Sequence, residues 1–490
     1  MAEREVELAR LIARLPTDTN VAGAVAAVLA CGIENDSRNV RPGAVFVALR
    51  GEHDDGHVFL ADAVANGAVA VVVETLPTVA VPPHVTVIRV SDSRHALSVL
   101  AAAFYDDPSH ALDVVGVTGT NGKTTTIHML QAVLDRAGRP CGTIGTIGAS
   151  FGSRSWPLAN TTPLPPELHG LMAAMREAGA RTVAMEVSSH ALALGRVDDV
   201  RFRVAALTNV TRDHLDFHET LEAYASAKRR LFSLARRAVL NAADVYGARW
   251  ARELTARGLA VTTYADRAGA NLVAADIVAT ADESRFTLDG TPYRVHLPGR
   301  FNVLNALAAI AVARELGVDD ATIARGLADL ERVPGRMERL CEDGIEVVID
   351  YAHTPDALER VLEALRETVA GKLAVVFGCG GDRDRGKRRA MGATAARLAD
   401  RVYVTSDNPR SEDPRAIVEE IVAGMGGRRH AIELDRRRAI ERAISEAHPG
   451  DAVLVAGKGH ETYQIVGSEI LDFDDAAVAR HALHLRAVLR

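Results

Sequence analysis

Paired cysteines are missing from this chain of 490 residues. Its four cysteines are scattered and form no C-x-x-C pair: Cys31, Cys141, Cys341 and Cys379. Zinc sites and disulfide frameworks need cysteines at characteristic spacings, so neither is indicated. We expect four reduced thiols, as is usual in a cytosolic protein.

A basic excess and a long apolar run are also missing. The chain has 57 basic against 64 acidic residues and a net charge of −7, whereas nucleic-acid-binding proteins usually carry a basic excess or patch. The N-terminus is charged and lacks the apolar core of a signal peptide, and no stretch is long enough to span a membrane. The sequence therefore predicts a cytoplasmic protein without a nucleic-acid partner. Its site for any anionic ligand must be locally basic.

Chain length and alternating apolar runs predict an α/β protein of several domains. At roughly 150 residues per domain, the length suggests about three. Short apolar runs alternate with helical patterns over residues 1–111, and two further α/β regions cover 112–332 and 333–490. In the first region, residues 36–38 and the loop after a predicted strand at 44–49 are polar, and such strand ends bind ligands in α/β sheets, although capped turns are at least as common.

The middle region begins with a candidate phosphate-binding loop. An apolar run at 114–117 leads into T-G-T-N-G-K-T at 118–124 and then into a helical pattern. Glycines allow backbone N–H groups to approach phosphate oxygens, Lys123 can reach the outer phosphates, and the Thr124 hydroxyl can bind Mg²⁺. The spacing departs from the standard loop, which has a glycine where this chain has Val117. The candidate phosphate ligands are Gly119, Thr120, Asn121, Gly122, Lys123, Thr124 and Thr125.

Two later strands of the middle region end in polar side chains. Residues 181–185 lead into Glu186, and residues 204–210 lead into a segment that contains His214. In a parallel sheet these ends gather at the same edge as the phosphate loop. Glu186 and His214 are therefore candidates to coordinate, directly or through water, the divalent ion that bridges nucleotide phosphates.

Three polar residues on predicted helices have more than one possible role. A helix predicted at 220–232 places Lys228 on an otherwise apolar stripe that includes Leu221, and from periodicity alone the Lys228 ammonium is expected to reach water. Asn302 and Asn305 lie in the first turn of an alanine-rich helix. They could cap this helix or contact a ligand, and capping is the commoner role.

The third region has the alternating pattern of a dinucleotide-binding-like domain. Strands are predicted at 346–350, 372–377, 401–405 and 452–456, and each leads into a polar or glycine-rich segment. No G-x-G-x-x-G fingerprint follows a strand, so a nicotinamide cofactor is not supported.

Together these motifs resemble the Mur ligases, which build the peptide stem of peptidoglycan. The phosphate loop with its displaced first glycine is similar to the ATP loop of that family. Further blocks are similar to the member that adds the third residue, and they lie at 36–38, 160–163, 186–190, 213–216, 335–338, 350–355 and 457–461. The D-N-P-R at 407–410 resembles its motif for meso-diaminopimelate. The resemblance covers essentially the whole chain and implies a UDP-substrate-binding domain, a central P-loop ATPase domain and a C-terminal Rossmann-like domain that binds the amino acid.

The resemblance implies an ATP-dependent amide ligase. ATP would phosphorylate the D-glutamate γ-carboxylate of UDP-MurNAc-L-Ala-D-Glu, and the amine of meso-diaminopimelate would attack the acyl phosphate and release phosphate. Lys123 and two Mg²⁺ ions would offset the negative charge of the first two substrates. In this family the residue matching Lys228 is carbamylated. The implied metal ligands are Thr124, Glu186, His214 and the Lys228 carbamate.

The resemblance also implies substrate-binding residues. Near ATP it places Asn302, Asn305, Arg336 and Asp350. For the UDP-muramoyl peptide it implies Ser37, Glu52, His53, Asp54, Asn160, Thr161, Thr162, Ser188 and Arg196. For diaminopimelate it implies Arg383, Asp407, Asn408, Pro409, Arg410, Gly457 and Glu461. One departure is Leu194, where relatives carry a glutamine.

Charge favours diaminopimelate over L-lysine as the amino acid. At its far end diaminopimelate carries a carboxylate beside its ammonium, whereas lysine carries the ammonium alone. Arg410, if it binds that carboxylate through two hydrogen bonds, would face a cation when lysine is present. Without the family pattern, residues 407–410 could equally form an Asn-Pro turn.

Other functions stay open at this stage. The ligase could use L-lysine, or it could add another residue to a muramoyl peptide or a folate, although Arg410 argues against lysine and the N-terminal region against folate. A P-loop kinase or nucleotide switch would turn over ATP without a muramoyl dipeptide. A binding protein on the same scaffold would not need the intact set of Lys123, Thr124, Glu186, His214 and Lys228. We expect a monomer.

Overall fold

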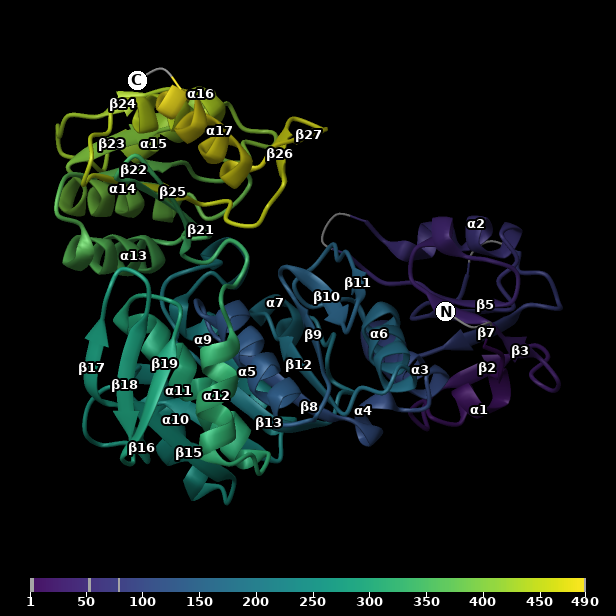
Figure 1. The fold of residues 1–490 in the computed structure, drawn as a ribbon. Coiled ribbons are helices and arrows are strands. Elements are labelled where there is room, and N and C mark those ends of the chain that lie inside the picture. Colours follow the sequence, from purple (N-terminus) through teal and green to yellow (C-terminus); the bar gives the residue numbers. More distant parts are fainter. Residues whose placement is uncertain (1–3, 52–53, 78–79, 489–490) are drawn as a thin grey trace. The chain divides into compact units, whose positions relative to one another are not determined.

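The computed structural model (Figure 1) describes residues 4–51, 54–77 and 80–488, and the chain divides into two compact units. Unit 1 comprises Met1–Gly116, Arg139–Ala205 and Arg230–Arg236, and unit 2 comprises Val117–Gly138, Ala206–Arg229 and Arg237–Arg490. The phosphate loop and the predicted third domain therefore lie in unit 2, whereas Glu186 lies in unit 1. The predicted domain boundaries after residues 111 and 332 do not coincide with this division and stay a prediction.

The N-terminal part of unit 1 is built on a five-stranded sheet with the order β2-β7-β6-β5-β4. The strands are β2 (Asn20–Ala22), β4 (Gly32–Glu34), β5 (Ala44–Val47), β6 (Ala70–Val73) and β7 (Thr86–Arg89). Only β2 runs antiparallel to its neighbour. Val45 and Val47 pack in one apolar cluster and Ala44 and Phe46 in another. Both faces of the sheet are thus covered, and its central strands are therefore continuous apolar runs.

The remaining strands and helices of unit 1 include the strand that ends at Glu186. Strands follow the order β11-β10-β9-β12, with β9 (Cys141–Gly145), β10 (Gly148–Phe151), β11 (Arg154–Trp156) and β12 (Thr182–Glu186). A short pair is formed by β1 (Val6–Glu7) and β3 (Leu29–Ala30). The helices are α1 (Leu8–Ile12), α2 (Leu60–Ala65), α3 (Ser93–Phe104), α4 (Pro108–Ala111), α6 (Pro165–Glu177) and α7 (Ser189–Ala193). Strands β8 (Asp113–Thr118) and β13 (Phe202–Leu207) begin in unit 1 and end in unit 2.

The first part of unit 2 carries the phosphate loop. Its helices are α5 (Lys123–Arg136), α8 (Leu215–His218), α9 (Leu221–Arg229), α10 (Val245–Ala256), α11 (Arg300–Glu315) and α12 (Asp320–Asp329). Parallel neighbours are β14 (Arg237–Asn241), β15 (Ala260–Ala265) and β16 (Leu272–Val273). An antiparallel sheet is formed by β17 (Ala275–Ala279), β18 (Ser284–Leu288) and β19 (Thr291–Val295).

The C-terminal part of unit 2 contains a six-stranded sheet with the order β20-β21-β25-β22-β23-β24. The strands are β20 (Glu338–Glu342), β21 (Ile345–Asp350), β22 (Leu373–Phe377), β23 (Arg401–Val404), β24 (Ala431–Ile432) and β25 (Ala452–Ala456). The helices are α13 (Pro355–Thr368), α14 (Gly386–Leu398), α15 (Pro414–Val422), α16 (Arg436–Ser445) and α17 (Asp475–Val488). Because β21, β22, β23 and β25 are parallel, the loops after them meet at one edge. A hairpin of β26 (Tyr463–Val466) and β27 (Glu469–Asp472) follows β25.

The observed elements confirm the predicted α/β pattern, with two differences around Lys228. The helix predicted at 220–232 is α9, and it tightens into a 3₁₀ turn at Arg230–Ser233. Leu221, which we expected on the apolar stripe, is 36% exposed. The stripe is therefore shorter than its periodicity indicated.

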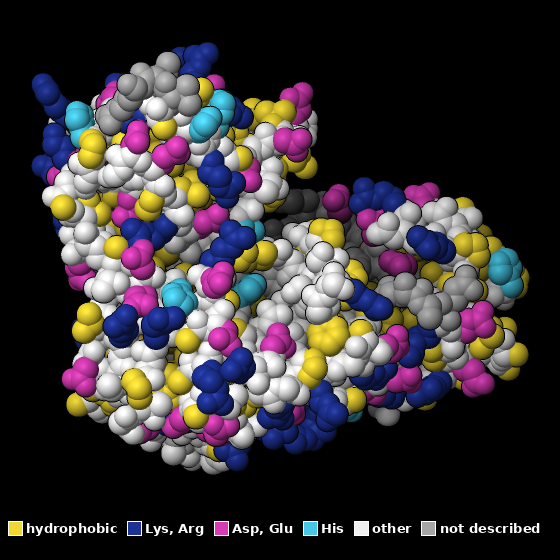
Figure 2. Space-filling view, in the orientation of Figure 1, with side chains coloured by type: hydrophobic (Ala, Val, Ile, Leu, Met, Phe, Trp, Pro, Cys, Tyr) yellow, Lys and Arg dark blue, Asp and Glu magenta, His cyan; other side chains and the backbone are white. Residues whose placement is uncertain are grey.

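The surface mixes charges of both signs. On the face drawn in Figure 2, Lys and Arg side chains are interspersed with Asp and Glu. No helix that the structure describes is long and apolar enough to cross a membrane. The four cysteines are free thiols, and Cys141 and Cys379 are buried.

Candidate functional site

The phosphate loop joins the end of β8 to the start of α5. Gly122 is the N-cap residue of α5, with φ of 89°, and no side chain caps this helix end. A Cβ on Gly122 would overlap the side-chain oxygen of Asn305, and one on Gly119 would overlap the hydroxyl of Thr208. Only glycine fits at these two positions, and the backbone can therefore approach a phosphate closely.

Two lysines meet at this loop. Lys123 Nζ donates to the carbonyl oxygens of Gly119 and Thr120, both at 2.9 Å. Lys228 Nζ donates to the same Gly119 oxygen at 2.8 Å. Lys228 is 1% exposed, so the expectation that its ammonium reaches water was wrong. The reason is that α9 packs its lysine against the phosphate loop and not against solvent.

Burial changes the chemistry of Lys228. Loss of hydration, with repulsion from Lys123, holds the pKa of Lys228 well below its usual value, and the attraction of Asp213 only partly offsets this. The Lys228 Nζ also lies 4.3 Å from the ring centre of Tyr224. A lowered pKa increases the share of the neutral amine, which is the nucleophilic form of lysine.

Asp213 is a buried carboxylate that was not among the site residues predicted from the sequence. Its Oδ2 lies 3.4 Å from His214 Nε2 and 4.0 Å from His353 Nε2. Burial alone would raise the pKa of Asp213, but the positive charges of His214 and Lys387 outweigh it, so that the pKa is held well below its usual range. Burial, with repulsion from Lys387, lowers the pKa of His353 to about 4. Asp213 precedes His214 in the polar segment after the same strand. It could therefore have been predicted as a site residue by the argument that identified His214.

Glu186 ends β12 in unit 1 and is 1% exposed. Its Oε1 accepts a hydrogen bond from the Thr146 backbone N–H at 2.9 Å, and its Oε2 accepts one from the Thr146 hydroxyl at 3.0 Å. Its backbone oxygen accepts a bond from Thr162 Oγ1 at 2.9 Å. The Glu186 carboxylate is thus held in one orientation at the carboxyl end of its strand.

Several residues expected to bind the UDP-muramoyl peptide gather near Thr162 in unit 1. Thr162 Oγ1 accepts from the Ser188 backbone N–H at 3.0 Å, and the Thr162 carbonyl accepts from Arg196 NH1 at 2.9 Å. Thr161 Oγ1 lies 3.2 Å from Thr146 Oγ1. Burial, with the nearby charge of Arg94, lowers the pKa of Arg196.

The other residues expected to bind this substrate do not belong to the cluster around Thr162. Ser37 is buried, and its carbonyl accepts from Asn66 Nδ2 at 2.9 Å. Asn160 and Asp54 are exposed. Glu52 and His53 lie outside the described residues. Leu194, the departure from the family pattern, is the C-cap residue of α7.

A pocket in unit 2 brings together the four residues expected near ATP: Asn302, Asn305, Arg336 and Asp350. Apolar side chains also line it, among them Phe301, Leu304 and Val361, and such a mixture suits a nucleoside. The pocket encloses about 70 Å³, so a nucleoside would require its lining to widen.

The polar residues of this pocket are tied to the phosphate loop. Arg336 NH2 donates to Thr124 Oγ1 at 2.9 Å, and its guanidinium lies 4.6 Å from the ring centre of Tyr351. Burial raises the pKa of Asp350, although Arg336 opposes the rise. The two asparagines do not cap α11, whose N-cap residue is Gly299 without a side-chain cap. Asn302 Nδ2 instead donates to the Pro298 carbonyl, so the capping expectation was wrong.

The residues expected to bind diaminopimelate meet at the edge of the six-stranded sheet. Asn408 Nδ2 donates to Glu461 Oε2 at 3.0 Å, and Arg410 NH1 donates to the Gly381 carbonyl at 2.8 Å. Burial, with repulsion from Arg383, lowers the pKa of Arg410. The remaining members lie in the same loops: Asp407 and Pro409 after β23, Gly457 after β25, and Arg383 after β22.

Two fully buried cations beside this cluster were not predicted. Lys458 Nζ donates to Asn408 Oδ1 at 3.1 Å and to Glu461 Oε2 at 3.0 Å. Arg436 forms a buried ion pair with Asp475, at 2.7 Å between NH2 and Oδ2, and also donates to the Ala456 carbonyl at 2.9 Å. Lys458 lies within the 457–461 block, but periodicity could not reveal that it points inward.

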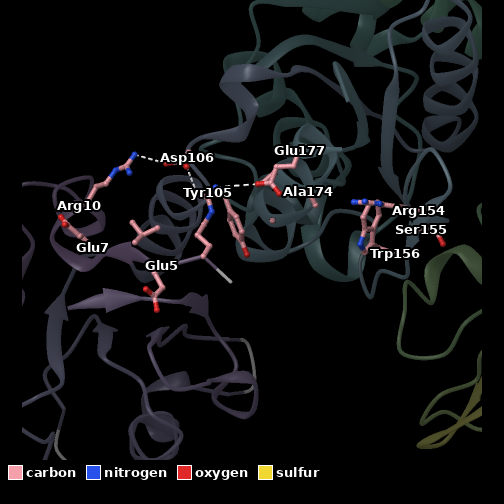
Figure 3. A pocket seen from close by; sticks show the side chains of 14 residues that line it. Glu5, Glu7, Arg10, Tyr105, Asp106, Arg154, Ser155, Trp156, Ala174 and Glu177 are labelled. Atoms are coloured by element: carbon pink, nitrogen blue, oxygen red, sulfur yellow. Dashed lines mark hydrogen bonds and ion pairs between the residues drawn. The ribbon is translucent and has the colours of Figure 1, made fainter. Parts of the chain in front are cut away.

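Unit 1 also contains a cavity of about 1090 Å³ (Figure 3). Its lining includes Arg10, which donates to Asp106 at 3.0 Å, and the hairpin residues Arg154 and Trp156. None of the predicted site residues is among the described residues that line it.

Family descriptions match three successive parts of the chain. "Mur ligase family, catalytic domain" matches residues 31–105, "Mur ligase middle domain" matches 117–313, and "Mur ligase, glutamate ligase domain" matches 335–459.

Individual relatives match along almost the whole chain. Two are named UDP-N-acetylmuramoyl-L-alanyl-D-glutamate–2,6-diaminopimelate ligase. The one from Gloeobacter violaceus is 47% identical over 93% of this chain and 94% of its own. The one from Geobacillus thermodenitrificans is 44% identical over 98% and 100%. A solved structure with the same name has a TM-score of 0.68 and 33% identity, and it covers 98% of this chain and 99% of its own. The chain therefore belongs to the Mur ligase family and has its three-domain architecture, with a central P-loop ATPase domain and a C-terminal Rossmann-like domain.

Proposed function

We propose that this chain is an ATP-dependent ligase that adds meso-diaminopimelate to the D-glutamate γ-carboxylate of UDP-MurNAc-L-Ala-D-Glu, through an acyl phosphate, in the synthesis of peptidoglycan precursors. The observation that carries the proposal is the 47% identity, over 93% of the chain, to a relative named for this reaction. The surroundings of Lys123, Lys228 and Arg410 support it.

The phosphate loop suits the triphosphate of ATP. Gly119 and Gly122 let the backbone approach phosphate oxygens, and the start of α5 favours negative charge. Lys123, which contacts two loop carbonyls, would exchange these for the outer phosphates. Its charge would then stabilise the phosphoryl group during transfer to the substrate carboxylate.

The candidate metal residues offer a hydroxyl, a carboxylate and an imidazole, from Thr124, Glu186 and His214. The oxygens of Thr124 and Glu186 suit Mg²⁺, and His214 would bind the ion directly or through water. A carbamate on Lys228 would add further oxygen ligands. The neutral Lys228 amine would attack CO₂, form an N–C bond and release one proton, which leaves a negative charge on the carbamate oxygens. When bound, two Mg²⁺ ions would neutralise charge on the phosphoryl oxygens.

The amino-acid cluster would hold diaminopimelate for attack on the acyl phosphate. Arg410 would bind the distal carboxylate, and the carboxylates of Asp407 and Glu461 would attract the distal ammonium. Lysine has no distal carboxylate, so Arg410 would face an ammonium group, and this repulsion favours diaminopimelate.

The test is phosphate release from ATP by the purified protein with Mg²⁺ and UDP-MurNAc-L-Ala-D-Glu, in the presence of meso-diaminopimelate, L-lysine or no amino acid. We expect release only with diaminopimelate, together with the tripeptide product in a mass spectrum. Equal release with lysine would contradict the specificity argument. ATP turnover without the muramoyl substrate would favour a nucleotide hydrolase or kinase instead.

We also propose that the protein acts as a monomer in the cytoplasm. The clusters around Lys228, Asn302 and Asn408 are each formed by side chains of a single copy of the chain, which supports this proposal. Light scattering of the purified protein at assay concentration tests the oligomeric state, and a stable dimer would contradict it.

A further inference from the structure

Lys458 is buried beside the side chains expected to bind the amino acid. It follows β25, it is 0% exposed, and its ammonium lies 5.4 Å from the ring centre of Tyr463. Its Nζ donates to Asn408 Oδ1 at 3.1 Å and to Glu461 Oε2 at 3.0 Å. A single ammonium thus joins the loop after β23 to the loop after β25.

These contacts determine the orientation of the Asn408 amide. The ammonium of Lys458 and the backbone N–H of Ile465 can only donate, and both point at the same atom of Asn408, the second at 3.0 Å. That atom must therefore be the oxygen. The amide nitrogen then donates to Glu461 Oε2 at 3.0 Å, so that Lys458 holds both side chains in place.

Lys458 also sets the charge of this cluster. Glu461 Oε2 accepts bonds from Lys458 and Asn408, and its Oε1 lies 3.3 Å from the Tyr351 hydroxyl. The buried ammonium therefore offsets part of the negative charge of Glu461, which would otherwise attract a cationic ligand more strongly. Without it, the cluster would be one unit more negative and would favour a ligand with extra positive charge.

We propose that Lys458 is a positioning residue that fixes Asn408 and Glu461 and sets the charge of this cluster, so that the cluster prefers a zwitterionic distal group over a cationic one. This rests on the proposed function. Diaminopimelate has a net charge of zero at neutral pH and a zwitterionic distal end. L-lysine has a net charge of +1 and a cationic distal end. When the charge of Lys458 is removed, the kcat/KM for L-lysine should rise relative to that for diaminopimelate.

The test compares K458M, K458Q and K458R with wild type in the phosphate-release assay. We expect K458M and K458Q to raise the KM for diaminopimelate about tenfold or more, because each loses charged hydrogen bonds. The KM values for ATP and for the muramoyl substrate should stay within about twofold. The ratio of kcat/KM for diaminopimelate to that for lysine should fall in both variants and should recover in K458R, which keeps the charge.

Lys372 provides a matched control, because it precedes β22 and is therefore at the opposite end of the sheet from these loops. K372M should leave the KM for diaminopimelate and the ratio of kcat/KM for diaminopimelate to that for L-lysine unchanged. An unchanged preference ratio in K458Q, or a uniform rise of all three KM values, would overturn the role of Lys458. Failure of the wild type to release phosphate with diaminopimelate would instead refute the proposed function, so the two failures can be told apart. K458Q removes the charge but keeps a polar side chain, so it keeps the proposal testable if K458M does not fold.

Discussion

Lys228 shows how the surroundings of one side chain change its chemistry. On an exposed helix face it would be an ordinary ammonium, but here it is 1% exposed and 2.8 Å from the Gly119 carbonyl. Burial and the charge of Lys123 hold its pKa well below the usual value. The residue is therefore suited to react as a neutral amine.

We expect Lys228→Met to reduce phosphate release at least about 100-fold, because a group that stabilises charge at the reacting phosphoryl would be lost. ¹³C NMR after equilibration with ¹³C-bicarbonate should show a carbamate signal in wild type that is missing from the variant. Lys372→Met serves as the control and should keep its activity. Full activity of the Lys228 variant would contradict the assigned role.

His169 is a second single residue with a large effect, because it makes the free energy of unfolding depend on pH. It is fully buried in α6, its ring nitrogens have no hydrogen-bond partner among the described residues, and burial lowers its pKa from 6.5 to about 4. Between these values the unfolded chain binds a proton that the folded chain does not. The free energy of unfolding should therefore be constant above pH 6.5 with respect to this group, and it should fall as the pH drops from 6.5 towards 4.

The loss should approach about 3 kcal/mol at pH 4, at about 1.4 kcal/mol for each pH unit. Urea unfolding of wild type and His169→Leu across this range measures it, and the variant should be less sensitive to acid. His448→Leu, at an exposed site with 73% of its side chain accessible, should follow the wild type. An identical acid response of wild type and the His169 variant would contradict the prediction.

At the scale of elements, the ends of parallel strands decide where the polar loops meet. Because β25 lies between β21 and β22, the loops that follow the strands of this sheet converge, although they are far apart in sequence. Arg436 at the start of α16 joins two of them, since it donates to the carbonyls of Ser406 and Ala456. Its charge is balanced by Asp475 at the start of α17.

We expect Arg436→Met to destabilise the C-terminal part of unit 2 by about 3–5 kcal/mol, because Asp475 would be left as a buried, unpaired carboxylate. Chemical unfolding monitored by hydrogen exchange of β23 and β25 measures this. Arg438→Met lies on the same helix with 73% of its side chain exposed and should change stability by less than about 0.5 kcal/mol. An equal loss of stability in the two variants would show that the buried ion pair contributes no more to stability than an exposed arginine does.

For the whole molecule, nucleotide binding should stabilise one unit more than the other. The phosphate loop, Lys228 and the pocket with Asn302 all belong to unit 2. A ligand that binds only the folded state, at about 100 times its Kd, stabilises that state by about 2.7 kcal/mol. We expect Mg²⁺-ATP at this concentration to slow hydrogen exchange in α5 and α11 by a corresponding factor of about 100.

Gly122→Ala should abolish this protection, because its Cβ would overlap Asn305. Gly138→Ala, at the other end of α5, faces open space and should keep the protection despite some strain from its φ of +66°. Protection confined to the β2-β7-β6-β5-β4 sheet of unit 1 would contradict the location of the nucleotide site.

Local patterns in the sequence predicted the elements and many of the site residues. The phosphate site could be identified from the strand, the glycine loop and the Gly-Lys-Thr that follow one another in the chain. About a dozen consecutive residues form this site, and their local sequence determines the backbone conformation that binds phosphate. The strands ending at Glu186, Asp350, Val404 and Ala456 were found because each apolar run ends in polar residues. The assignment of substrates, by contrast, came from the resemblance of these blocks to a family and not from their physical pattern.

What this sequence determined by itself was therefore the α/β architecture, the phosphate loop and the set of polar strand ends. The tertiary structure alone decided which side chains are deprived of water: Lys228 at the phosphate loop, Asp213 between two histidines, and Lys458 beneath the amino-acid cluster. The physical reason is that pKa and hydrogen-bond partners depend on neighbours brought from distant parts of the chain. Periodicity places a residue on a face of its helix or strand, but only packing determines what covers that face.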